Sequence, residues 1–189
     1  MEAISGSGEL SASKWKPLAP IKYQLDRLAV LQVLCNLKTA EINCLIMALK
    51  IIDHGTREYQ QMVKLRDDIL RKPLGLGFSK EELEKEKSNM LIAAFEDEDM
   101  LGCCMLVEEK SDTVRLRQMA VLNDLQGKGI GRALMGFAEN LARDRGFKII
   151  NMHARKSTIH FFEKMGYKVA GAEFIELTIP HCIMEKQLY

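Results

Sequence analysis

The sequence predicts a mixed α/β (α+β) fold in which helices cover a single central sheet. Apolar residues alternate along several short runs, as in strands, and recur every three or four residues along others, as in amphipathic helices. Runs of the two kinds follow one another, which is the pattern of a layered domain of sheet and helices. With 189 residues, the chain is long enough for one domain with a substantial core.

The expected elements begin near residue 49 and continue to the C-terminus. In chain order they are a strand at 49–53, helices at 56–71 and 79–87, strands at 90–95, 100–107 and 113–121, a helix from Gly129, a strand at 148–154, a short helix that ends at Gly166, a strand that starts at Tyr167, and a last strand at 174–186.

Local features justify the N-terminal elements of this series. Met62, Leu65 and Ile69 share one face of the first helix and are expected to point inward. Ser79 and Glu82 have the spacing of a capping box, which predicts a helix start at residue 79. The acidic residues 96–99 separate two apolar runs and predict a hairpin.

The strand at 113–121 and the helix that follows it are the most regular part of the sequence. Strict alternation places one set of strand residues on each face of the sheet. The two sets are Val114, Leu116, Gln118 and Ala120 on one face, and Arg115, Arg117, Met119 and Val121 on the other. The apolar residues of the helix recur at helical spacing, at Ile130, Leu134, Phe137 and Leu141.

A glycine-rich segment, Gln126-Gly-Lys-Gly129-Ile-Gly131-Arg132, joins this strand to this helix. Glycines at a helix start let a ligand approach the backbone closely. The free N–H groups there, together with the positive end of the helix dipole, form a site for phosphate groups. The segment therefore predicts a site for a phosphorylated ligand.

Two nucleotide-binding loops fit this segment poorly. In a P-loop, a Lys and a Ser or Thr follow the last glycine, whereas Lys128 lies between glycines. The dinucleotide fingerprint needs an acidic residue about 20 positions after its glycines, and this chain has Asn151 there. A nucleotide-binding regulatory domain stays an alternative that competition by NAD or ATP would reveal.

A third pattern, Q/R-x-x-G-x-G/A, matches the segment at every fixed position. The segment resembles the pyrophosphate-binding loop of the GCN5-related N-acetyltransferase (GNAT) family, whose members bind acyl-coenzyme A. Residues 155–167 resemble a second motif of the family, a short helix that ends in a pattern like A-x-x-F-Y-E-K-x-G-F/Y.

Three further stretches resemble one bacterial branch of the family, the ElaA/YjcF-like acetyltransferases. They are Arg71-Lys-Pro-Leu-Gly75, Leu116-Arg-Gln-Met-Ala120 and the ending Ile179-Pro-His-Cys-Ile-Met-Glu-Lys. The resemblance runs from about residue 47 to the C-terminus.

The resemblance implies the acyl-CoA N-acyltransferase fold, in which a mixed, mostly antiparallel sheet is flanked by about four helices. Two strands of that fold splay apart to admit the pantetheine arm of acetyl-CoA, the implied cosubstrate. The backbone N–H of Met119 is implied to stabilise the developing oxyanion. The residues implied to bind the cosubstrate are Met119, Ala120, Val121, Gln126, Gly127, Lys128, Gly129, Ile130, Gly131, Arg132, Phe161 and Phe162.

The acceptor side is less clearly marked. An alkylamine is cationic at neutral pH and must lose a proton before it attacks. His153 and His181 are the candidate bases, with a structural role in the sheet as the alternative for each. Arg66 and Arg71 lie near the break between the first two helices, where the family binds its acceptor. They are candidates to contact a carboxylate or phosphate on it, with simple solvation as the alternative.

These features predict an acetyl-CoA-dependent N-acetyltransferase that works by direct attack of an amine in a ternary complex. The acceptor is expected to be a small-molecule or peptide amine. A CoA-binding sensor or interaction module with weak or lost catalysis is the alternative, because Phe162 stands where many family members have a tyrosine that protonates the leaving thiolate.

Composition limits the other partners. The 27 basic and 26 acidic residues are nearly balanced, so neither nucleic acid nor a membrane surface is expected to bind. The five cysteines, Cys35, Cys44, Cys103, Cys104 and Cys182, lack metal-site spacing and suit a reducing cytoplasm, and no metal is expected. Adjacent Cys103 and Cys104 should point to opposite faces of their strand. The resemblance adds a homodimer to these expectations.

Residues 1–46 are predicted to be an extension, partly disordered or helical, to a domain at 47–189. Residues 1–20 are rich in Ser, Gly and Ala. Charged residues interrupt the apolar stretch 25–49, which therefore lacks the run of about 18 apolar residues that a membrane span needs. Leu28, Leu31, Leu34 and Cys35 would share one face of a helix.

Overall fold

The computed structural model describes residues 29–30 and 47–189. The predicted extension therefore lies outside the described residues, except for Ala29–Val30, and the domain boundary at residue 47 stays a prediction. Ala29–Val30 form a short strand that pairs with residues 48–49, where the sequence suggested a helix.

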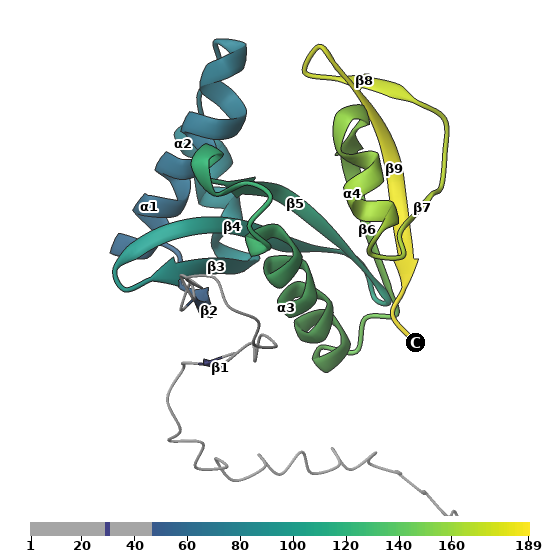
Figure 1. The fold of residues 1–189 in the computed structure, drawn as a ribbon, viewed down its shortest axis with the longest axis horizontal. Coiled ribbons are helices and arrows are strands. Elements are labelled where there is room, and N and C mark those ends of the chain that lie inside the picture. The colour runs from purple at the N-terminus through teal and green to yellow at the C-terminus, as the bar shows by residue number, and fades with distance from the viewer. Residues whose placement is uncertain (1–28, 31–46) are drawn as a thin grey trace, which may run out of the picture.

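A nine-stranded sheet organises the described part of the chain (Figure 1). The strand order is β1-β2-β3-β4-β5-β6-β9-β7, and β8 pairs with β9. The strands are β1 (Ala29–Val30), β2 (Ala48–Ile52), β3 (Met90–Glu96), β4 (Asp99–Lys110), β5 (Thr113–Val121), β6 (Ile149–Arg155), β7 (Lys168–Val169), β8 (Phe174–Glu176) and β9 (Ile179–Gln187). Among the described strands, β5 and β6 are parallel and every other pair is antiparallel. The predicted mixed, mostly antiparallel sheet is confirmed.

Helices lie on both faces of this sheet (Figure 1). The α-helices are α1 (Arg57–Arg66), α2 (Lys80–Glu84), α3 (Ile130–Asp144) and α4 (Ile159–Glu163). Shorter helical segments are the π-helix η1 (Asp67–Arg71) and the 3₁₀ helices η2 (Lys72–Leu74), η3 (Lys85–Ser88), η4 (Asn123–Leu125) and η5 (Lys156–Thr158). Within the described ranges, none of the helices has the length and apolar character needed to cross a membrane.

Side-chain caps start the first two α-helices, and the sequence predicted the second of them. Thr56 caps α1, because its hydroxyl accepts a hydrogen bond from the N–H of Tyr59 at 3.2 Å. The capping box of α2 is complete, since the Glu82 N–H donates to the Ser79 hydroxyl at 3.1 Å and the Ser79 N–H donates to the Glu82 carboxylate at 2.8 Å.

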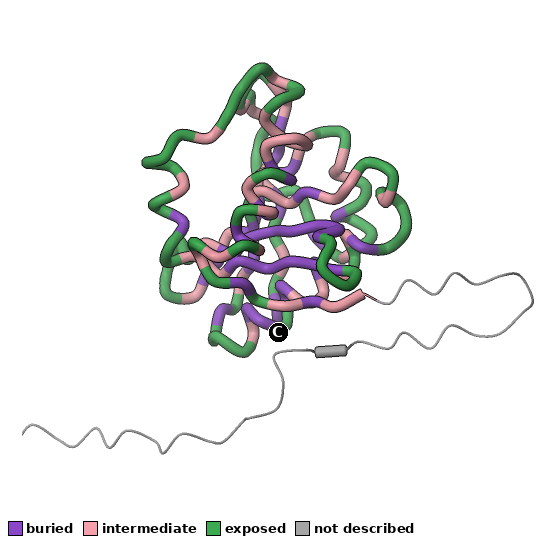
Figure 2. The backbone as a smooth tube through the Cα atoms, turned by 90° about the vertical axis from the view of Figure 1, so that its left-hand side faces the viewer, coloured by how far each residue is buried: buried purple, intermediate pink, exposed green. Residues whose placement is uncertain are grey.

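Two apolar clusters fill the spaces on the two faces of the sheet. The first contains Ile130 and Leu134 of α3, and the second contains Met62 of α1. Strand β4 contributes to both, with Cys104 in the first cluster and Cys103 in the second. The predicted opposite orientation of these two cysteines is confirmed, and Figure 2 shows the central strands buried along much of their length.

Strand β5 departs from the strict alternation that the sequence predicted. Val114 and Leu116 belong to the first cluster, as expected, but Ala120 belongs to the second. Gln118 has a φ of 50°, and the pairing with β4 shifts register at this point. A β-bulge at Gln118 and Met119 therefore reverses the faces to which the last side chains of β5 point, and the predicted faces are wrong beyond Arg117.

The single strand predicted at 174–186 is also wrong, because the chain forms a hairpin there. Strands β8 and β9 pair antiparallel around Leu177 and Thr178. These two residues have φ values of 48° and 69°, the left-handed backbone of a two-residue hairpin turn. Glycine or Asn usually marks such a turn, and neither occurs at these two positions.

Candidate active site

A cavity opens where β5 and β6 separate. The two strands pair from Thr113–Ile149 to Leu116–Met152 and then diverge. The cavity between them has a volume of about 800 Å³. It is lined by the end of β5, the glycine-rich segment, β6, α4, the end of η1 and the β8–β9 hairpin. This volume lies within the range of small-molecule binding sites.

The glycine-rich segment forms one wall of this cavity. Gly127 and Gly129 have φ values of 80° and 91°, a left-handed backbone that disfavours any residue with a Cβ atom. Gly129 is the N-cap of α3, and no side chain in the described part of the chain caps this helix. The N–H groups of its first turn are therefore available to an anion.

Gly131 has an ordinary backbone, and its constraint is close packing. A Cβ atom at this position would lie 3.2 Å from the Met119 side chain and 3.3 Å from the Phe161 ring. The first turn of α3 thus lies directly against β5 and α4. Three segments predicted to bind the cosubstrate meet at this glycine.

Most of the other predicted cosubstrate residues line the same cavity. The lining includes Met119, Ala120, Val121, Gln126, Arg132, Phe161 and Phe162. Lys128 is exposed and lies outside the lining, and the Ile130 side chain is buried in the core with 1 % exposure. The backbone of Ile130 can still contribute to the site, but its side chain cannot.

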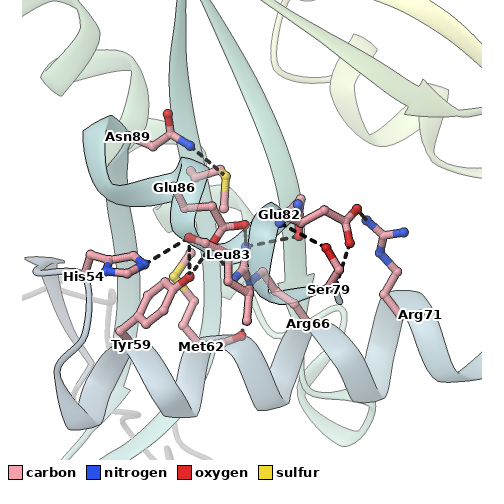
Figure 3. Close-up of polar contacts among 12 residues, drawn as sticks. His54, Tyr59, Met62, Arg66, Arg71, Ser79, Glu82, Leu83, Glu86 and Asn89 are labelled. Carbon is pink, nitrogen blue, oxygen red and sulfur yellow. Dashed lines mark hydrogen bonds and ion pairs between the residues drawn. The ribbon is translucent and has the colours of Figure 1, made fainter. Parts of the chain in front are cut away.

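A buried ion pair joins Arg66 and Glu86 (Figure 3) and supports the bulge in β5 through Gln118. Arg66 of α1 has no exposed surface, and its two terminal nitrogens each donate to the Glu86 carboxylate at 2.9 Å. Glu86 also accepts a hydrogen bond from the Tyr59 hydroxyl at 2.7 Å. Burial raises the pKa of Tyr59 well above its usual value, which keeps this hydroxyl a donor. Arg66 in turn donates to the side-chain oxygen of Gln118 at 3.1 Å.

The prediction that Arg66 contacts the acceptor is therefore wrong. Its guanidinium is fully buried and does not line the cavity, because Glu86 and Gln118 bind it on the inner side of α1. Arg71 does line the cavity. The Arg71 guanidinium stacks on the Phe78 ring at 4.6 Å.

The two predicted histidines both line the cavity, but their partners differ. The Nδ1 atom of His153 lies 2.8 Å from the Glu176 carboxylate, which can only accept, so Nδ1 carries the proton in the neutral ring. Among the described residues, Nε2 has no hydrogen-bond partner. Nδ1 of His181 lies 2.8 Å from the Ile179 carbonyl. The Phe174 ring packs against both histidines, with ring centroids 4.9 and 6.0 Å apart.

The sequence did not predict a role for Glu176. This residue ends β8. Because residues 174–186 were interpreted as one strand, the hairpin that brings Glu176 next to His153 of β6 was not expected. Turn-forming residues such as Asn or Gly in place of Leu177 and Thr178 would have predicted this hairpin.

The aromatic residues of α4 close another side of the cavity. Phe162 is buried, and its ring packs edge-on against Phe161 and Tyr167 with centroids 4.9 and 6.0 Å apart. The Tyr167 hydroxyl does not replace the missing hydroxyl of Phe162, because it donates to Glu139 at 3.1 Å. Burial also raises the pKa of Tyr167, so this phenol is a poor acid.

Comparison with known proteins identifies relatives over the C-terminal part of the chain. Residues 77–188, more than half of the chain, match the family described as "Acetyltransferase (GNAT) domain". The uncharacterized protein YyaT of Bacillus subtilis is 26% identical over 76 residues, which are 40% of this chain and 51% of that protein. The chain spans about half the length of the curated relatives it matches.

Solved structures share the fold. A crystal structure of an aminoglycoside 6'-N-acetyltransferase complexed with coenzyme A superposes with a TM-score of 0.65 at 18% identity, over 75% of this chain and 97% of that one. Escherichia coli ElaA superposes with a TM-score of 0.65 at 13% identity, over 75% of this chain and 99% of that one. At these identities the likeness concerns the fold alone.

We predict that Gly131→Ala destabilises the protein, because its Cβ atom would press on Met119 and Phe161. The expected loss of unfolding free energy is about 1–3 kcal/mol, as for other overpacked sites. Gly136→Ala in the same helix is the control. A Cβ atom there meets nothing within 4 Å, and the change should stabilise the helix by about 0.5–1 kcal/mol. Urea denaturation measures both values, and equal effects would contradict the packing role of Gly131.

We also predict that Arg66→Met costs about 3–5 kcal/mol of unfolding free energy, because it leaves the Glu86 carboxylate buried without its partner. Replacing both residues, as Arg66→Met with Glu86→Leu, should cost less than the single change, since no charge is then stranded. Lys64→Met removes an exposed ion pair with Asp68 on the same helix and should have a much smaller effect. Denaturation curves that show equal losses for Arg66→Met and Lys64→Met would refute the buried-pair account.

Proposed function

Because the chain belongs to the GNAT acetyltransferase family, we propose that it transfers the acetyl group of acetyl-CoA to an amine by direct attack in a ternary complex. One observation carries this proposal. The cavity at the separation of β5 and β6 combines the uncapped start of α3 with a histidine whose Nε2 is free. It therefore offers groups for both the anionic donor and the amine.

The donor would bind along β5 and the first turn of α3. The pyrophosphate accepts hydrogen bonds from the N–H groups around Gly129 and Gly131, and Arg132 adds a positive charge beside them. The helix dipole contributes only about 0.3–1 kcal/mol per charge at an exposed site, so several hydrogen bonds must share the binding. The pantetheine arm pairs with the edge of β5 that β6 leaves open after Leu116.

The groups for acetyl transfer come from the two strands that border the opening, His153 from β6 and the backbone N–H of Met119 from β5. His153 accepts a proton from the ammonium group of the acceptor through Nε2, while Glu176 holds the opposite ring nitrogen. The neutral amine attacks the thioester carbonyl, and the N–H of Met119 donates to the oxyanion. The nitrogen of the tetrahedral intermediate loses its second proton to solvent, the C–S bond breaks, and coenzyme A leaves as a thiolate that is protonated from solvent. His181 is the less suitable base, because its Nδ1 is bound to a carbonyl rather than to a carboxylate.

Phe162 supports a second candidate function, a CoA-binding sensor or interaction module. This residue lines the cavity and has no proton to give to the thiolate. Loss of a general acid commonly costs about 10²–10⁴-fold in rate. A sensor would bind acetyl-CoA and release no coenzyme A with any amine.

We further propose that the chain belongs to the ElaA/YjcF-like branch of the family. The motifs at 71–75, 116–120 and 179–186 support this assignment. The likeness to Escherichia coli ElaA is compatible with it but concerns the fold alone.

The first test is calorimetric titration of the purified protein with acetyl-CoA, with NADH and ATP as controls. We expect selective binding of acetyl-CoA, because the glycine-rich segment lacks the features that nucleotide-binding loops need. Release of coenzyme A on addition of an amine then separates the enzyme from the sensor. A folded sample that does not bind acetyl-CoA would require the proposal to be withdrawn.

A second test concerns the base. His153→Ala should lower kcat/KM by about 10²–10⁴-fold, because the amine loses its proton acceptor. The Kd of acetyl-CoA should not change. His160→Ala is the matched control, since this histidine lies on α4 with 76% of its side chain exposed. If the two variants have the same kcat/KM, His153 is not the base.

A further inference from the structure

Two arginines on β5 that line the cavity differ in how their charges are neutralised. Arg115 forms an ion pair with Glu109 and donates to the Asn151 side chain at 3.2 Å. Arg117 lies two residues farther along β5 and is exposed to the cavity. Within residues 29–30 and 47–189, its guanidinium has neither a hydrogen bond nor an ion pair. Its donors are therefore available to a ligand.

The register of the strands places Arg117 opposite the proposed base. Leu116 and Met152 form the last pair between β5 and β6, so Arg117 and His153 are the next residues on the two diverging strands. The preceding side chains, Arg115 and Asn151, bond to each other on one face of the sheet. Arg117 and His153 lie two residues beyond them, on the same face. An acceptor whose amine is at His153 thus has Arg117 across the opening.

Arg71 reaches the same cavity from the end of η1. Its guanidinium is held on the Phe78 ring at 4.6 Å, and its side chain keeps 16% exposure. Its contact with Glu82 is a single one of 3.4 Å, and the Glu82 carboxylate also caps α2. A guanidinium has five N–H donors, so most of those of Arg71 are free to bind a ligand.

Carboxylates are scarce among the described residues that line the cavity. Glu176 is the single one, and His153 binds it at 2.8 Å. Among the described residues, Arg117 thus has no negative partner, and Arg71 has a single ion pair, to Glu82 at 3.4 Å. The planar guanidinium matches carboxylate and phosphate groups in geometry and charge.

We propose that the acceptor is a primary amine that also carries a carboxylate or phosphate group, and that Arg117 and Arg71 bind this group while the amine lies at His153. This inference rests on the proposed acetyl transfer. In this arrangement Arg117 and Arg71 select the acceptor. Acetyl-CoA binds on the other side of the cavity, at the glycine-rich segment and the first turn of α3.

The test compares matched pairs of amines at saturating acetyl-CoA, with release of coenzyme A as the readout. The pairs are glycine and glycinamide, phenylalanine and phenylalaninamide, and phosphoethanolamine and ethanolamine. We expect kcat/KM to be about tenfold or more higher for an anionic member than for its neutral partner, the size of a hydrogen bond to a charged group. The amino acid amides have the less basic amines, so easier deprotonation cannot explain a preference for the acids.

Variants assign this preference to the two arginines. Arg117→Ala should remove the preference for the anionic member, and Arg71→Ala should reduce it. Arg145→Ala is the control, because Arg145 is exposed beyond the end of α3 and does not line the cavity. Preference among amino acids alone assigns the ligand group as a carboxylate, and preference for phosphoethanolamine alone assigns it as a phosphate.

A binding measurement tests the inference even if none of the amines assayed is the natural acceptor. The protein loaded with coenzyme A is titrated with N-acetylglycine and with N-acetylglycinamide, and the anionic product should bind more tightly. Neutral members that react or bind as well as the anionic ones would overturn the inference, as would a complete lack of reaction and binding by the anionic set. Failure of acetyl-CoA itself to bind would instead remove the proposed function, and the inference with it.

Discussion

The bulge at Gln118 is the constraint on which the rest of the site depends. It reverses the faces to which the last side chains of β5 point, and it lies two residues beyond Leu116, the last residue of β5 that pairs with β6. A left-handed backbone at a residue other than glycine costs about 1–3 kcal/mol and persists only where neighbouring groups enforce it. Arg66 supplies this enforcement, because it donates to the Gln118 side chain while Glu86 neutralises it. Strand separation, the open edge and the cavity all follow from this arrangement.

The ion pair behind the bulge is well suited to hold a fixed geometry. Burying two charges costs several kcal/mol per ion unless every donor and acceptor finds a partner. In the described part of the chain, no buried side-chain nitrogen or oxygen lacks a hydrogen-bond partner. A pair satisfied in this way has few alternative arrangements, so helix α1, η3 and strand β5 are held in one relative position. Precise placement of the Met119 backbone follows from contacts made outside the cavity.

Local sequence patterns predicted the glycine-rich wall of the cavity better than the opposite wall. Gly127 and Gly129 adopt a backbone that only glycine tolerates well, so their positions are visible in the sequence. The bulge is not visible, because Met119 and Ala120 suit either face of a sheet. Arg66 was expected near the surface, since a long charged residue is seldom fully buried without a partner. Its partner lies 20 residues away, in a segment that sequence periodicity does not connect to it.

The walls of the cavity come from different parts of the chain, so the sequence of one wall can change while the other stays the same. The wall proposed to bind acetyl-CoA is built from the end of β5, the start of α3 and α4, all within the matched residues 77–188. Arg71 stands on η1, which precedes that range. Substitution or exchange of the helical segment at 67–74 would therefore reshape the wall proposed to bind the acceptor and leave the wall proposed to bind acetyl-CoA intact. The proposed selectivity for one amine over another would then be modular, and a chimaera that receives η1 and η2 from a relative would inherit part of that relative's selectivity.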